Sequence, residues 1–191
     1  VPAFTTVNNG TAPVTATVIV TPTFANGGVN CAGTADTFYI VVNPTATVNA
    51  INNQTVCNGA AVAAVTPTTT ATGGTVTYAW TNDNASIGLA ASGTGTIPAF
   101  TAINTGTAPV TATITVTPSF TNDGLSCTGT VRTYTITVNP TATVNTVSNQ
   151  VVCNGSAVAA VNFSTTATGG TVTYAWTNSN SSIGLAASGT G

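Results

Sequence analysis

The amino-acid sequence repeats itself at a fixed distance of 96 residues. Residues 42–49 (VNPTATVN) return letter for letter as residues 138–145, and the same offset carries Trp80 to Trp176 without insertion or deletion. Self-similarity at one constant period is typical of tandem arrays, in which each repeat is one structural unit. We therefore expect a segment of a longer repetitive polypeptide rather than one large domain.

The repeated stretch contains the predicted boundary between units. Pro44 and Pro140 occupy equivalent positions in it, each preceded by an asparagine, Asn43 or Asn139. Proline fixes its own φ and keeps the preceding residue extended, so we expect these four residues to form a stiff interdomain seam. The predicted domains are the C-terminal part of one repeat (residues 1–43), a complete repeat (44–139) and the N-terminal part of the next (140–191).

Within a repeat, apolar side chains alternate with threonines. One such apolar face consists of Val110, Ala112, Ile114 and Val116. Period-two alternation of β-branched residues indicates a half-buried strand. Some seven short runs of this kind, separated by Gly, Asn and Pro and without helical periodicity, predict an all-β chain of immunoglobulin-like antiparallel β-sandwiches. An odd strand number places the domain termini at opposite ends, which predicts head-to-tail stacking with a rise of roughly 35–45 Å per domain.

The largest apolar side chains of each repeat lie on one predicted strand. Tyr78 and Trp80 share a face in the first copy, as Tyr174 and Trp176 do in the second. Aromatic rings on one face of a central strand are expected to anchor a core. The alternative is that these rings are exposed and bind sugars.

Charged side chains are nearly absent. The chain has one Arg, three Asp and no Lys, Glu or His, which is 2% of its residues. Binding of nucleic acid requires several basic residues to neutralise phosphates, and anionic membranes attract basic clusters, so neither partner is expected. No apolar run approaches the roughly 18 residues of a membrane-spanning helix, and no membrane insertion of this segment is expected.

The sequence also lacks the residue combinations that catalysis requires. Its Ser and Thr hydroxyls have no His or Lys to activate them, and no paired carboxylates suit glycoside hydrolysis. The run from Asn82 through Asp83 to Asn84 offers oxygen ligands for calcium, but the second copy has Ser179 in place of the carboxylate. A turn capped by amides is therefore favoured over a cation site. We expect no enzymatic activity, no cofactor and no metal site.

Three motifs carry a resemblance to a known family. They are residues 54–59 (QTVCNG), 74–82 (GTVTYAWTN) and 108–116 (APVTATITV). Together they resemble the PKD-like, immunoglobulin-like tandem repeats of very large cell-surface adhesins in Bacteroidota, including those used in flavobacterial gliding motility. The resemblance covers the whole sequence. It implies an extracellular, surface-anchored thread, exported by the type IX secretion pathway, and it offers no catalytic residues.

In an exported array of this kind, the four cysteines predict structural disulfides. Cys57 with Cys127 is the only pairing inside the complete repeat, and it leaves Cys31 and Cys153 to partners outside the sequence. The first turn and the last hairpin loop of a seven-stranded sandwich, however, lie at opposite ends. The alternative is a staple between neighbouring domains, which joins Cys57 to the residue one period beyond Cys127.

Two functions are compatible with these observations. The first is a structural repeat segment of an extracellular filament or stalk that mediates adhesion, with neighbouring repeats and surface polysaccharide or other cell-surface ligands as partners. The alternative is a glycan-binding accessory module of a large secreted polysaccharide-degrading enzyme. Sheet edges that carry Thr rather than protective Lys also allow lateral self-association.

Overall fold

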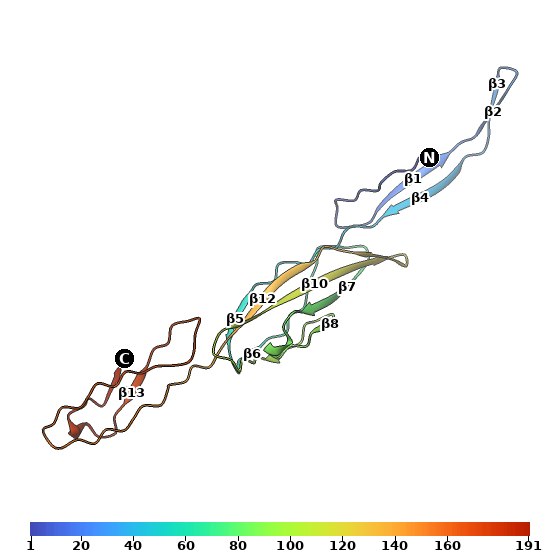
Figure 1. The fold of residues 1–191 in the computed structure, drawn as a ribbon. Helices are drawn as coiled ribbons and strands as arrows, with labels where there is room; N and C mark the ends of the chain where they lie inside the picture. The colour runs from blue at the N-terminus through green and yellow to red at the C-terminus, as the bar shows by residue number, and fades with distance from the viewer.

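The computed structural model describes residues 1–191 and is mostly β-structure without an α-helix. Its only helical elements are two short 3₁₀ turns, η1 (Ala85–Ile87) and η2 (Ser181–Ile183). The predicted all-β class is therefore confirmed. Figure 1 shows three segments that follow one another along one direction. We name them the N-terminal segment (residues 1–43), the central unit (44–139) and the C-terminal segment (140–191).

The central unit contains most of the strands. They are β5 (Gln54–Cys57), β6 (Ala61–Val62), β7 (Thr75–Asn82), β8 (Ser92–Thr94), β9 (Phe100–Thr101), β10 (Val110–Asn122), β11 (Leu125–Thr128) and β12 (Arg132–Asn139). Six of them form one sheet, in which five follow the order β5-β12-β10-β7-β8 and β11 pairs with β10; only the β5–β12 pair is parallel. Because β10 is 13 residues long, it extends beyond β12 and pairs there with β11.

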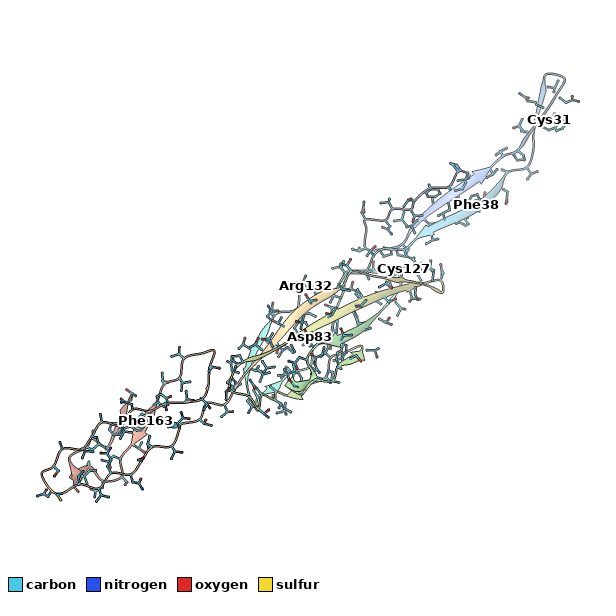
Figure 2. All side chains as sticks on the ribbon, in the orientation of Figure 1. Cys31, Phe38, Asp83, Cys127, Arg132 and Phe163 are labelled. Carbon is cyan, nitrogen blue, oxygen red and sulfur yellow. The ribbon has the colours of Figure 1, made fainter.

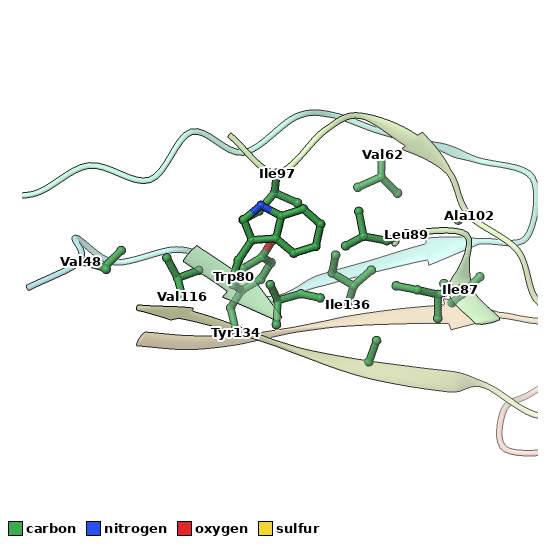
Figure 3. Packing of buried hydrophobic residues seen from close by; sticks show 13 residues of the cluster. Val48, Val62, Trp80, Ile87, Leu89, Ile97, Ala102, Val116, Tyr134 and Ile136 are labelled. Atoms are coloured by element: carbon green, nitrogen blue, oxygen red, sulfur yellow. The ribbon is translucent and has the colours of Figure 1, made fainter. Parts of the chain in front are cut away.

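A smaller layer faces this sheet. β6 and β9 form a separate two-stranded sheet, and an isolated bridge joins Val65 to Ile97. Figure 3 shows Val62 and Ile97 across the core from Ile136 of the large sheet. The Val65–Ile97 bridge and the β6–β9 pair share one antiparallel register, although the ladder is not continuous between them. The expected sandwich is thus seen only in part, as one extended sheet opposite a much smaller layer.

The core of the molecule lies entirely within the central unit. Its thirteen buried residues are Val48, Val62, Trp80, Ile87, Leu89, Ile97, Ala102, Ala112, Ile114, Val116, Tyr134, Ile136 and Val138. Six of them come from β10 and β12, in which every second side chain points inward. Burying one large apolar side chain stabilises a fold by about 1.5–3 kcal/mol, so this cluster is the main source of stability.

The two terminal segments contain equivalents of central strands but no core of their own. In the N-terminal segment, β1 (Val14–Val20) pairs with β4 (Asp36–Val42), and β2 (Thr23–Asn26) pairs with β3 (Val29–Ala32). The C-terminal segment has β13 (Ala175–Thr177) and β14 (Ser188–Thr190). The registers match those of the central unit one period away. Many of the apolar side chains in both segments are exposed.

Candidate functional site at the interdomain seam

The seam before the central unit is covered by a projecting hairpin. We call the part of the β10–β11 hairpin beyond β12, residues 117–131, the arm. The Thr130 backbone N–H donates to the Ala46 carbonyl oxygen at 2.8 Å, and the Asn122 side-chain amide donates to Asn43 Oδ1 at 3.0 Å. Pro44 is fully buried beneath these contacts. The predicted seam residues Asn43 and Pro44 are thus held by a hairpin that lies about 80 residues further along the chain.

A second contact joins the loops on either side of each seam. The Thr72 N–H donates to the Thr11 carbonyl oxygen at 2.7 Å, and one period later the Thr168 N–H donates to the Thr107 carbonyl oxygen at the same distance. Beside each bond a glycine with positive φ, Gly73 or Gly169, lies against a proline of the preceding repeat. This loop-to-loop contact is therefore the same at both seams.

The far end of the central unit is closed by two asparagines. The Asn58 N–H donates to the Asn139 carbonyl oxygen at 2.9 Å, and its side-chain amide donates to Thr141 Oγ1 at 3.1 Å. The buried Asn104 side chain donates to the Val138 carbonyl oxygen at 2.7 Å and to the Ala108 carbonyl oxygen at 2.9 Å. Asn58 Oδ1 in turn accepts from the Asn104 N–H at 2.8 Å.

Sequence reasoning did not single out Asn58 or Asn104, since the chain is rich in asparagine throughout. The only available signal in the sequence was that both asparagines recur at the 96-residue period. Asn8, one period before Asn104, donates to the Val42 carbonyl oxygen at 2.7 Å in the same way.

The structure separates the two cysteines of the central unit. Cys57 is opposite Asn139 at one end of the sheet, whereas Cys127 is opposite Phe120 in the arm at the other end. The β10 register places about eleven residues between these two levels, which is roughly 36 Å at 3.3 Å per residue. A disulfide requires Cα atoms within about 7 Å of each other. The predicted Cys57–Cys127 pair therefore does not form within the central unit.

All four cysteines are free in the structure, and Figure 2 shows Cys31 near the outer tip of the N-terminal segment and Cys127 beside the first seam. Disulfides of Cys31 and Cys153 with partners outside the sequence stay a prediction. The same holds for a staple across a seam.

The aromatic residues differ between the two copies in their surroundings. Trp80 lies in the core cluster, and Tyr78 packs against it while partly exposed. Burial raises the pKa of Tyr78 above its ordinary value. Trp176 and Tyr174 lie half-buried in the C-terminal segment, where the Tyr174 ring is 5.6 Å from that of Phe163.

The turn from Asn82 to Asn84 is filled by internal hydrogen bonds. The Thr113 N–H donates to Asp83 Oδ1 at 2.6 Å, and the Asn84 side chain accepts from the Ser86 N–H at the start of η1. The Asn82 amide donates to the Leu89 carbonyl oxygen at 3.0 Å. The structure contains no group of three or more His, Cys, Asp or Glu side chains that could hold a metal ion. No helix in it is long and apolar enough to cross a membrane.

One sheet face differs between the repeats in a way that sequence reasoning missed. In the N-terminal segment, Ile19, Tyr39 and Val41 lie on the outer face of the β1–β4 hairpin, and Tyr39 is 66% exposed. One period later these positions are all threonine. We call these three residues the outer patch. Position-by-position comparison of the two copies would have revealed it from the sequence.

Comparisons with known proteins do not assign the chain to a family. No protein-family model matches the chain, and no curated protein matches it.

Proposed function

We propose that the chain is a structural segment of an extracellular filament or stalk that mediates adhesion without catalysis. The observation that carries this proposal is the repeated seam. Both seams contain the same loop-to-loop hydrogen bond at 2.7 Å and the same glycine-to-proline contact. A seam with one geometry, repeated every 96 residues, supports a stalk of fixed direction rather than domains that tumble on flexible linkers.

The finer fold in this proposal is a head-to-tail array of immunoglobulin-like, PKD-like domains with boundaries at residues 43/44 and 139/140. Two features support it. The antiparallel order β12-β10-β7-β8 with a parallel edge strand β5, opposite the β6–β9 layer, matches one extended sheet of such a sandwich. All core residues also come from between Val48 and Val138.

Adhesion in this proposal relies on many weak contacts. The chain carries 2% charged residues, so its surface offers hydroxyls, amides and scattered apolar groups rather than a charged binding site. Repetition of a weak surface along one thread raises its avidity without a strong single site. Export by the type IX pathway and a part in gliding motility rest on the resemblance to Bacteroidota adhesins alone.

Electron microscopy of the polypeptide sheared from the surface of producing cells tests the stalk directly. The expected result is a beaded thread with an axial repeat of roughly 35–45 Å, set by strand length plus the seam. Compact particles, in which these repeats surround a larger catalytic body, would refute the stalk.

A second candidate function is a glycan-binding module of a secreted polysaccharide-degrading enzyme. The outer patch favours it, because exposed aromatic rings on a sheet suit stacking against sugars and only one copy carries the ring. Binding of the chain to insoluble polysaccharides should then fall on substitution Tyr39→Ala. The matched control is Thr135→Ala, the equivalent position one period later. Equal binding by both variants would remove this candidate.

A further inference from the structure

An open groove of about 500 Å³ lies along the edge of β12 in the central unit. Its lining combines apolar, amide and cationic side chains from two segments of the chain: Ile51, Asn52, Asn53, Val131, Arg132 and Thr133. All six residues belong to the unit that contains the core, and neither adjoining segment contributes to the lining. The groove is therefore a feature of the folded repeat itself.

A mismatch in length between two paired segments opens the groove. Thr47 forms a parallel bridge with Thr130, and parallel pairing resumes where Gln54 of β5 lies opposite Ile136 of β12. The first segment takes seven steps between these two points and β12 takes only six. The extra residue lets the first segment leave the edge of β12, and Ile51 packs against the core there. A short stretch of the β12 edge consequently has no neighbouring strand.

This uncovered edge presents backbone hydrogen-bonding groups to the groove. The Thr135 N–H donates to Asn53 Oδ1 at 2.9 Å, so the backbone of Thr135 points away from β10. Backbone groups alternate in direction along a strand, and Thr133 therefore points its N–H and its carbonyl oxygen the same way. No strand pairs with Thr133 on that side, because β5 begins only at the level of Ile136. Both backbone groups of Thr133 are available to a ligand.

The side chains of the groove add donors and a positive charge. Asn53 accepts the Thr135 N–H with its oxygen, which leaves its NH₂ group as a free donor. Arg132 is exposed, is the only cationic side chain of the sequence, and carries its N–H donors in a planar fork. Figure 2 labels it in the central unit. None of the three aspartates lines the groove, so the site contains donors and a cation without a carboxylate of its own.

We propose that this groove binds the carboxylate of an acidic sugar, a uronate residue within a polysaccharide. The Arg132 guanidinium and a carboxylate form paired, parallel hydrogen bonds, and their single charges balance. A phosphate dianion would keep an uncompensated negative charge beside one arginine. Val131 is 54% exposed and offers apolar contact to the C–H face of the sugar ring, while the Thr133 carbonyl oxygen accepts from a sugar hydroxyl. Because the groove is open, a polymer can pass along it without a free chain end.

The charge of this site is particular to the central repeat. One period earlier Asp36 takes the place of Arg132, and its carboxylate would repel a uronate. The inference rests on the proposed adhesive function, for which it names a ligand class, and it adds selectivity for charge to a surface of hydroxyls, amides and apolar groups. Binding is measured on the isolated chain, so a negative result would leave the stalk, which electron microscopy tests, unaffected.

Titration of the isotope-labelled 191-residue chain with tetragalacturonate, followed by NMR, tests the site. The Thr133 amide signal and the Asn53 side-chain NH₂ signals should shift and saturate. The fully methyl-esterified tetragalacturonate has the same sugar rings without the charge and should bind about five- to tenfold more weakly, as expected for loss of charged hydrogen bonds. This comparison uses wild-type chain, so it does not depend on how any variant folds.

Arg132→Gln should weaken binding of tetragalacturonate by a similar factor, because it removes the charge and the planar fork. The matched control is Asp36→Asn, which also changes the net charge by one unit and retains the Oδ1 that accepts from the Thr37 N–H. Its affinity should equal that of wild type, and a changed affinity would point to net charge rather than to this groove.

The proposal is overturned if tetragalacturonate shifts no signals or shifts signals outside the groove. It is equally overturned if the ester binds as tightly as the acid, or if Arg132→Gln binds like wild type. An acidic peptide that shifts the groove signals where tetragalacturonate does not would replace the glycan with a protein partner.

Discussion

Phe120 and Phe24 are the same residue of two successive repeats, and they should respond very differently to truncation. Phe120 is fully buried against the seam end of the central unit, whereas Phe24 is 70% exposed. Phe→Ala at a buried site typically costs about 3–5 kcal/mol, from lost apolar burial and the cavity that remains. An exposed site away from special features changes the free energy of unfolding by no more than about 0.5 kcal/mol. We therefore expect Phe120→Ala to destabilise the central unit strongly and Phe24→Ala to leave it unchanged.

Urea unfolding of dilute, monomeric chain measures this difference. A Trp176→Phe background leaves Trp80 as the only indole, so its fluorescence reports on the central core. With a slope of about 2 kcal/mol per molar urea, a loss of about 4 kcal/mol lowers the midpoint by about 2 M. Equal midpoint shifts for Phe120→Ala and Phe24→Ala would refute the burial of Phe120 at the seam end of the central unit.

Three further predictions follow from single contacts. Gly93→Ala places a Cβ against the buried Trp80 indole and should lower the stability of the central unit by about 1–3 kcal/mol in the same urea assay; an unchanged midpoint would contradict it. Burial raises the pKa of the Tyr134 hydroxyl above its ordinary value of 10.0. The stability that its neutral form gives the fold is therefore complete below pH 10 and is lost as the pH rises through the pKa of the folded state. Tyr134→Phe should remove this loss of stability in thermal melts at increasing alkaline pH. Oxidation of monomeric chain with glutathione disulfide should produce no Cys57–Cys127 peptide in mass spectrometry, and finding that peptide would contradict the separation along β10.

The local strands could be predicted from the sequence because their signal is local. Alternation of Val, Ala and Ile with threonine in residues 110–116 marks the inward face of β10, and the structure buries Ala112, Ile114 and Val116 on that face. The place of Trp80 in the core could likewise be predicted from its size and its position in the alternating strand. These inferences need only the period of a strand and the tendency of large apolar groups to leave water.

The long-range features could not be predicted in the same way. The arm folds back onto Asn43 through a hydrogen bond that spans 79 residues, and no local pattern encodes that contact. The length of β10 also prevents a disulfide between Cys57 and Cys127, since it sets the distance between them. Strand number alone predicted that the two residues lie at opposite ends of the domain, but it did not give the distance between them.

The position of the seam could be predicted from the sequence, but its contacts could not. Identity of residues 42–49 with 138–145 located it, whereas its contacts come from loops that look like ordinary polar turns. Thr11 and Thr72 are two of many threonines, and only the fold reveals that their backbones meet.

The central claim is that the repeats stack end to end through a fixed seam, and small-angle X-ray scattering of the 191-residue chain in dilute solution tests it most directly. Three stacked segments with a rise of roughly 35–45 Å each form a rod about 110 Å long, which has a radius of gyration of roughly 32 Å. A compact body of 191 residues would have a radius of gyration of about 16 Å, and an unfolded chain about 47 Å. A value near 32 Å with a rod-like distance distribution is the predicted result. A value near 16 Å would show that the segments fold back on one another and would contradict the stacked array.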